Sequence, residues 1–233
     1  MPETYKFARM PILSLKDEAP LGYEILFRNW YGISLEIFNQ CPILYSELAN
    51  PLLKAIYQLD RAGKCRIEGQ KLFINMTILQ LMSMGCLEFL TELDQSDHRL
   101  TDVVIELTEH ELGHLPKALS ERVLLLKRFG CQFAVDDFGR QSSNFSRVFE
   151  LKPDFIKLDR SLIATAGGCS EQQRVLISLI ELCHREAIQV IVEGVETQAH
   201  LDLVKACRAD YVQGFHFGLP EAILNNSVNL TNS

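Results

Sequence analysis

The runs VVIEL (103–107), QFAVD (132–136), DFIKL (154–158) and QVIVE (189–193) are short and rich in β-branched and aromatic residues, as buried strands are. Helix-like stretches lie between several of them, such as LPKALSERVLLLKRFG (115–130) and SEQQRVLISLIELCHREA (170–187). This alternation is typical of a parallel sheet covered by helices. The segment therefore predicts a series of βα units.

The same alternation extends toward both ends of the chain. Four further runs fit strands: MPILSL (10–15), GYEILF (22–27), LFIN (72–75) and DYVQG (210–214). Helices are expected over residues 43–63 and 197–207. The eight runs predict an α/β fold, a modified TIM-type (β/α)8 barrel. Because LKDEAPLG between the first two runs is too short for a parallel crossover, we expect one antiparallel strand near the N-terminus.

The composition excludes several classes of protein. With 47% hydrophobic residues among 233, the chain can fill one large core, and we expect a single domain over residues 1–233. A net charge of −7 without a stripe of Lys and Arg argues against nucleic-acid binding. The seven cysteines form no C-x-x-C pair, which predicts reduced thiols and a cytoplasmic location. No apolar run reaches the roughly 18 residues that span a bilayer, so no membrane anchor is expected.

Polar residues occur where the expected strands end. They are Asn75, Glu106, Asp136, Asp137, Lys157, Glu193 and Gln213. Any one of them has another explanation, because Asp and Asn also cap helices and turn the chain. In a barrel, however, the carboxyl ends of the strands meet at one rim, and the joint placement favours a functional site. Carboxylate and amide oxygens suit Mg²⁺ or Mn²⁺, and the adjacent Asp136 and Asp137 fit a bridging arrangement for two ions.

Seven motifs follow one another along the chain: GYEILFR, FINMT, VIELTE, AVDDFG, FIKLD, VEGVET and YVQGFHFGLP. In this order and spacing they resemble the EAL family of cyclic di-GMP phosphodiesterases over essentially the whole chain. The signature reads Glu24-Ile25-Leu26, with Ile where the family usually has Ala, and it leaves the acid and the following Leu-x-Arg intact. The resemblance implies metal-dependent hydrolysis of cyclic di-GMP to linear pGpG.

The resemblance also implies roles for individual residues. The implied metal ligands are Glu24, Asn75, Glu106, Asp136 and Asp137, which would hold two Mg²⁺ or Mn²⁺ ions. The implied catalytic residues are Glu24, Lys157 and Glu193, and the implied substrate-binding residues are Leu26, Arg28 and Gln213. Lys157 would hold or activate the attacking water, and Arg28 would grip a phosphate. A homodimer is a further expectation from the family.

Two departures from the family pattern leave an alternative open. The loop after the paired Asp runs Arg140-Gln141-Ser142-Ser143-Asn144, where the family usually has Thr-Gly-Tyr-Ser-Ser and uses the loop to order Asp137 and to form a dimer contact. We expect Arg140 to reach a neighbouring acid. Met10 stands where the family commonly has a Gln that helps to hold the ligand. The alternative is a cyclic di-GMP receptor or protein-interaction module with little turnover, working with a regulatory protein partner.

Overall fold

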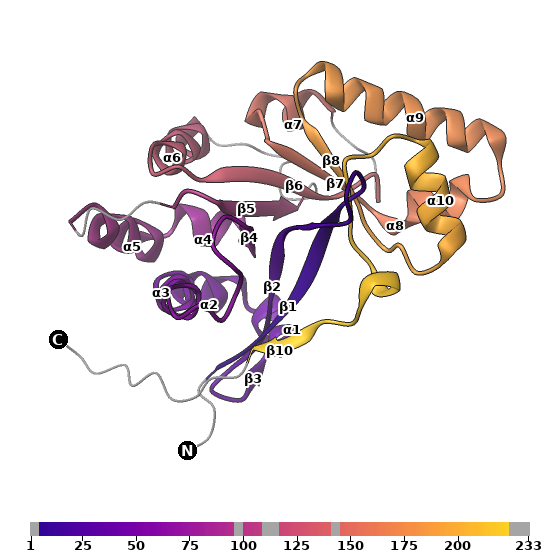
Figure 1. Ribbon diagram of the computed structural model, residues 1–233. Helices are drawn as coiled ribbons and strands as arrows, with labels where there is room; N and C mark the ends of the chain where they lie inside the picture. The colour runs from indigo at the N-terminus through magenta and orange to yellow at the C-terminus, as the bar shows by residue number, and fades with distance from the viewer. Residues whose placement is uncertain (1–4, 96–99, 109–116, 141–144, 224–233) are drawn as a thin grey trace.

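Strands run through the middle of the molecule and helices lie around them in the computed structural model (Figure 1), which describes residues 5–95, 100–108, 117–140 and 145–223. The strands are β1 (Tyr5–Ser14), β2 (Pro20–Trp30), β3 (Ile33–Ser34), β4 (Lys71–Asn75), β5 (Val103–Thr108), β6 (Gln132–Phe138), β7 (Phe155–Leu158), β8 (Gln189–Val192), β9 (Tyr211–Val212) and β10 (Glu221–Ile223). The α-helices are α1 (Leu35–Gln40), α2 (Pro42–Glu47), α3 (Ala49–Arg61), α4 (Ile78–Met82), α5 (Met84–Gln95), α6 (Lys117–Arg128), α7 (Phe145–Leu151), α8 (Arg160–Ala166), α9 (Ser170–Arg185) and α10 (Gln198–Ala206).

Eight of these strands close into a barrel. The order around the ring is β1-β9-β8-β7-β6-β5-β4-β2, and β2 pairs back with β1. Along the ring from β2 through β4, β5, β6, β7 and β8 to β9, each strand is parallel to the next. Strand β1 is antiparallel to both of its neighbours, β2 and β9. The predicted modified (β/α)8 barrel with one antiparallel strand near the N-terminus is therefore confirmed. Strands β3 and β10 add short antiparallel pairs to β2 and β1 outside the ring.

The helix expected over residues 43–63 is interrupted at Leu48, which separates α2 from α3. Pro51 provides the physical reason, since proline has no amide hydrogen to donate to the carbonyl four residues earlier. Helices α1, α4, α5 and α7 and strands β3 and β10 were not predicted. For α4 the sequence held a usable signal: the Thr77 hydroxyl accepts from the Gln80 amide while the Gln80 side chain accepts from the Thr77 amide, a capping box.

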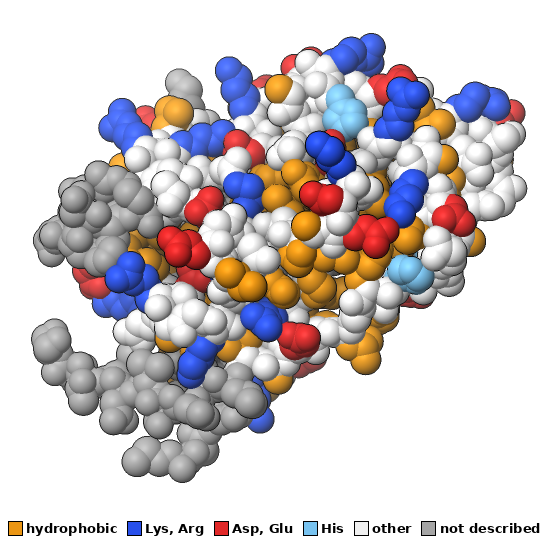
Figure 2. All heavy atoms as spheres, viewed as in Figure 1, with side chains coloured by type: hydrophobic (Ala, Val, Ile, Leu, Met, Phe, Trp, Pro, Cys, Tyr) orange, Lys and Arg blue, Asp and Glu red, His pale blue; other side chains and the backbone are white. Residues whose placement is uncertain are grey.

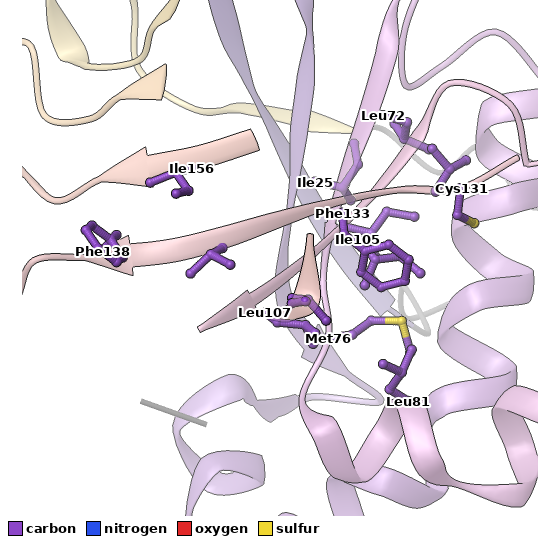
Figure 3. Packing of buried hydrophobic residues seen from close by; sticks show 14 of the residues in the cluster. Ile25, Leu72, Met76, Leu81, Ile105, Leu107, Cys131, Phe133, Phe138 and Ile156 are labelled. Carbon is purple, nitrogen blue, oxygen red and sulfur yellow. The ribbon is translucent and has the colours of Figure 1, made fainter. Parts of the chain in front are cut away.

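Apolar side chains that point outward from the barrel form the larger core against the helices. Figure 3 shows Ile25, Ile105 and Phe133 from neighbouring strands in one group of apolar side chains, with Leu72 and Cys131 on one side of it and Met76 and Leu81 on the other. A second and smaller cluster is separate from the first. It consists of Ile12, Phe73, Val104, Ala134, Phe155 and Ile191, one residue from each of six strands. Each of these side chains is fully buried, and each strand alternates faces, so this cluster fills the barrel interior.

Strand closure between β2 and β4 depends on a residue without a side chain. A Cβ on Gly22 would lie well inside van der Waals contact with the backbone carbonyl of Lys71, its partner on β4. We expect Gly22→Ala to lower the free energy of unfolding by at least about 3 kcal/mol, because two paired backbones must move apart. Chemical denaturation measures this, with Gly168→Ala as control, since no atom lies within 4 Å of a Cβ there. Equal stability of the two variants would contradict the close approach.

Acidic and basic side chains are interspersed over the described surface of the face drawn in Figure 2, and this face shows no continuous basic stripe. This distribution agrees with the net charge of −7. Among the described helices, none has both the length and the apolar character required to cross a bilayer. All seven cysteines are free thiols.

Candidate active site

The site lies one layer above the apolar cluster that fills the barrel. On five of the parallel strands, a site residue follows a member of that cluster by two positions: Phe73 and Asn75, Val104 and Glu106, Ala134 and Asp136, Phe155 and Lys157, Ile191 and Glu193. Residues two apart on a strand point to the same face, so all of these side chains point into the barrel at its carboxyl end. On the antiparallel β1 the direction reverses, and Met10 precedes Ile12.

Lys157 lies at the centre of this layer. Its ammonium nitrogen Nζ is 2.8 Å from Glu193 Oε1, 2.9 Å from Glu106 Oε1, 3.2 Å from Asp136 Oδ1 and 3.3 Å from Glu24 Oε2. The lysine side chain is 1% exposed. Four carboxylates against one ammonium leave three negative charges uncompensated when all the groups are ionised.

Glu24 is the best satisfied of the four carboxylates. The Asn75 amide donates to its Oε1 at 2.7 Å, and the Gln213 amide donates to its Oε2 at 2.8 Å. Burial by itself raises the pKa of Glu24, but the positive charge of Lys157 and these hydrogen bonds outweigh it and lower the pKa. Glu24 is therefore held in its ionised form.

The pKa of Glu106 is shifted in the opposite direction to that of Glu24. Oε1 lies 2.9 Å from Lys157 Nζ, but neither carboxylate oxygen has a hydrogen-bond partner among the described residues. Burial, joined by repulsion from Glu24 and Asp136, raises the pKa of Glu106 well above its ordinary value despite the attraction of Lys157. Burial also dominates at Asp136, whose pKa is likewise raised. The negative charge of the site is thus under-compensated by the protein itself.

The paired aspartates sit on a β-bulge. In the pairing of β6 with β7, Val135 is opposite Ile156 and Phe138 is opposite Leu158, so Asp136 and Asp137 together face Lys157. An extra residue in a bulge re-aims the side chains around it. Asp136 points to the lysine, while Asp137, with a left-handed φ of 56°, lies at the pocket rim.

A pocket of about 530 Å³ opens above the carboxylates. Glu24, Glu193 and Gln213 line its floor, and Met10, Asp137 and Arg140 are also among its lining residues. Arg160 and Phe215 line it too, and the sequence analysis did not nominate them. The sequence held a signal for both, since Phe215 lies within the quoted motif YVQGFHFGLP and Arg160 directly follows the quoted motif FIKLD.

Two nominated substrate residues lie away from this pocket lining. Leu26 and Arg28 continue β2 beyond Glu24, and neither is among the residues that line the pocket. Arg28 is exposed and is the extra residue of a bulge, since Phe27 pairs with Phe7 and Asn29 pairs with Lys6. Asp159 caps helix α8 by accepting from the Ser161 amide at 2.9 Å. Residues 141–144 of the departing loop lie outside the described residues.

The donor set fits a divalent cation. Within the described ranges no three His, Cys, Asp or Glu side chains are arranged around a shared point for an ion, because the carboxylates converge on Lys157 instead. Their chemistry nevertheless favours a cation, because four carboxylates face a single ammonium. Among the described residues, both Glu106 carboxylate oxygens and Asp136 Oδ1 are buried without a hydrogen-bond partner. Oxygen donors of this kind suit Mg²⁺ or Mn²⁺.

We expect the metal-free protein to lose stability as the pH rises. Burial, with repulsion from Asp136 and Glu24, raises the pKa of Glu193 from 4.5 to about 8 despite the attraction of Lys157. Between these values the folded state holds a proton that the unfolded chain has released, so the free energy of unfolding falls with pH. Urea denaturation in EDTA at pH 5.5 and 8.5 measures the fall, and Glu193→Gln should flatten it. Rising stability over this range in the unaltered chain would contradict the electrostatic account.

The fold and the site together define a class of protein, a mixed eight-stranded barrel with an oxygen-rich acidic site at its mouth. Within that class the chain belongs to the EAL-domain family, because the family model described as "EAL domain" matches residues 9–220. The resemblance that the motifs indicated is therefore confirmed.

Curated relatives carry names that state an activity. The chain is 31% identical over 157 residues to "Probable cyclic di-GMP phosphodiesterase PdeG" of Escherichia coli, covering 66% of this chain and 30% of that protein. It is 29% identical over 219 residues to "Cyclic di-GMP phosphodiesterase RocR" of Pseudomonas aeruginosa, covering 90% of this chain and 56% of that protein. The chain thus spans less than two thirds of the length of either relative.

Solved structures show the same fold. The manganese and cyclic di-GMP complex of BlrP1 from Klebsiella pneumoniae matches with a TM-score of 0.82 and 25% identity over 95% of this chain and 57% of that one. A standalone EAL protein from Vibrio cholerae O395, in a form bound to cyclic di-GMP, matches with a TM-score of 0.75 and 22% identity over 95% of this chain and 94% of that one. The second likeness supports the fold alone.

Proposed function

We propose that this chain is a metal-dependent phosphodiesterase that hydrolyses cyclic di-GMP to linear pGpG. The observation that carries the proposal is the group of four carboxylates around Lys157 beneath a pocket of about 530 Å³. Relatives named for this activity, and a related structure that contains manganese and cyclic di-GMP, support the same substrate and a divalent cation.

In this proposal the carboxylates at the barrel mouth bind two cations, Mg²⁺ or Mn²⁺. Glu24, Asn75, Glu106 and Asp136 hold the first ion, and Asp136 and Asp137 hold the second. When bound, such ions supply water of lowered pKa and offset the charge that develops on the phosphate. The bulge that turns Asp137 toward the rim supports separate positions for the two aspartates.

Lys157 acts as a hydrogen-bond donor rather than as a base. Burial by itself would lower the pKa of this lysine, but the attraction of the four surrounding carboxylates raises it well above the ordinary value. A lysine that stays protonated cannot accept a proton from water, but it can orient the water and stabilise negative charge. Glu193 lies 2.8 Å from Lys157, and in the metal-free protein burial raises its pKa to about 8.

Substrate binding is assigned to the pocket and to β2 above it. Gln213 donates to Glu24 from the pocket floor, and Leu26 and Arg28 lie farther along the strand that carries Glu24. An exposed arginine on a bulge is free to reach a phosphate, because bulges commonly re-aim side chains next to active sites.

The experiment is product analysis by chromatography. The purified chain is incubated with cyclic di-GMP and Mg²⁺ or Mn²⁺, with Asp136→Asn as a control that keeps side-chain volume. Appearance of pGpG with the unaltered chain and its absence with the variant support the proposal. Saturable binding of cyclic di-GMP without product favours the receptor alternative, for which the ion pair between Arg140 and Asp137 is the specific observation.

The proposal extends to the setting of the chain. One domain over residues 1–233 would act in the cytoplasm, where its seven free thiols stay reduced. A homodimer and a regulatory protein partner follow from the family resemblance, and size-exclusion chromatography with light scattering tests the dimer.

A further inference from the structure

Arg140 is positioned against Asp137 by the turn that follows the bulge of β6. Its backbone amide donates to the Asp137 carbonyl at 3.2 Å, which closes the turn. Its guanidinium nitrogen Nη1 then lies 3.3 Å from Asp137 Oδ2, as a hydrogen bond and an ion pair. The expectation that Arg140 reaches a neighbouring acid is therefore confirmed.

The pair lies at the rim and not in the buried layer. The Arg140 side chain is 64% exposed and the Asp137 side chain is 37% exposed, and both residues line the pocket above the four carboxylates. A guanidinium carries a fixed positive charge and offers only donors. It contacts one oxygen of the carboxylate that a cation at the rim would use, and two cations close to one carboxylate repel each other.

We propose that Arg140 is a tethered competitor that must leave Asp137 before the second divalent cation binds there. This inference rests on the proposed function, because it takes Asp137 as a ligand of that cation. Arg140 makes the second binding step weaker than the first and dependent on the concentration of divalent cations.

The strength of the competition between Arg140 and the cation depends on how exposed the Arg140–Asp137 ion pair is to solvent. Solvent-exposed ion pairs are weak, so the competition is a modest factor and not a block. We expect Arg140→Met to tighten the second binding step about two- to fivefold and to leave the first step unchanged. Because salt screens exposed pairs, the difference between the variant and the unaltered chain should shrink as the ionic strength is raised.

Arg160 provides a matched control on the same pocket. It is another exposed arginine that lines the pocket. Unlike Arg140, it forms no ion pair with Asp137, and the structure describes both residues. Arg160→Met removes the same charge and the same side chain from the pocket. Arg140→Lys is the conservative variant, since it keeps a positive charge within reach of Asp137.

The test is a titration with Mn²⁺ in which the free ion is followed by electron paramagnetic resonance, so that the readout is binding and not turnover. Two steps in the unaltered chain, with a tighter second step in Arg140→Met and a nearly unaltered one in Arg160→Met and Arg140→Lys, support the inference. An unaltered second step in Arg140→Met overturns it. So does an equal shift in Arg160→Met, which indicates a general charge effect. Absence of saturable Mn²⁺ binding in the unaltered chain overturns the proposed metal site, a result that does not depend on any variant.

Discussion

Replacement of Lys157 by methionine is expected to lower the free energy of unfolding of the metal-free protein by about 3–5 kcal/mol at pH 8, the usual cost of leaving buried charge without its partner. Methionine has a similar length, so packing is largely kept, but the ammonium that faces Glu24, Glu106, Asp136 and Glu193 is lost. Turnover of cyclic di-GMP should also be lost, because the protonated donor is removed from the site.

The cost should depend on pH and on divalent cations. At pH 5.5 the carboxylates with raised pKa values take up protons, so the variant should be less destabilised there than at pH 8. Added Mg²⁺ should restore part of the loss, since it supplies positive charge to the same carboxylates. Lys205→Met is the control, because Lys205 forms only an exposed ion pair with Glu18 and its loss should cost at most about 1 kcal/mol. Equal destabilisation of the two variants would contradict the central position of Lys157.

Most of the fold was predictable because strand period and turn length are local properties. The runs at 103–107, 132–136 and 189–193 coincide closely with β5, β6 and β8. The short connection between the first two runs fixed their antiparallel direction. Short elements such as β3 and β10 were missed, since two or three residues carry no periodic signal and are set by pairing with strands that are already in place.

The alternation of side chains along each strand predicted that the site residues converge at the barrel mouth. It did not predict the position of each side chain there. Phe155 and Lys157 share a face of β7, and the same spacing recurs on its neighbours, so the buried layer follows from the sequence. Adjacent residues such as Asp136 and Asp137 should point to opposite faces, and only the bulge against β7 brings both to the mouth. The sequence contains no signal for that bulge that we could identify.

The balance of positive and negative charge in the site could not be predicted from the sequence. The motifs nominate acids and a lysine, but they do not reveal that one ammonium contacts four carboxylates at once. The attraction of these carboxylates raises the pKa of Lys157 well above its ordinary value, and the motifs alone give no sign of that shift.

Glu24→Gln and Glu106→Gln are expected to abolish function alike and to affect stability in opposite directions. Both substitutions keep the volume of a buried side chain and replace a carboxyl group of the same site by an amide that cannot ionise. As both residues are proposed ligands of the first cation, each variant should lose cyclic di-GMP turnover by at least about a hundredfold, since changes even to groups that support metal ligands cost 10–100-fold.

The stability difference follows from what each carboxylate contacts. Glu24 accepts hydrogen bonds from Asn75 and Gln213 and has a lowered pKa, so an amide in its place loses charge-assisted bonds and should cost about 1.5–3 kcal/mol. Glu106 has no hydrogen-bond partner among the described residues and has a strongly raised pKa, so an amide in its place avoids the burial and repulsion that oppose the ionised carboxylate. Denaturation in EDTA at pH 8 should therefore find Glu106→Gln at least as stable as the unaltered chain and Glu24→Gln less stable. If the order were reversed, the assignment of these two electrostatic environments would be wrong, whereas retained turnover in either variant would remove that residue from the proposed metal site.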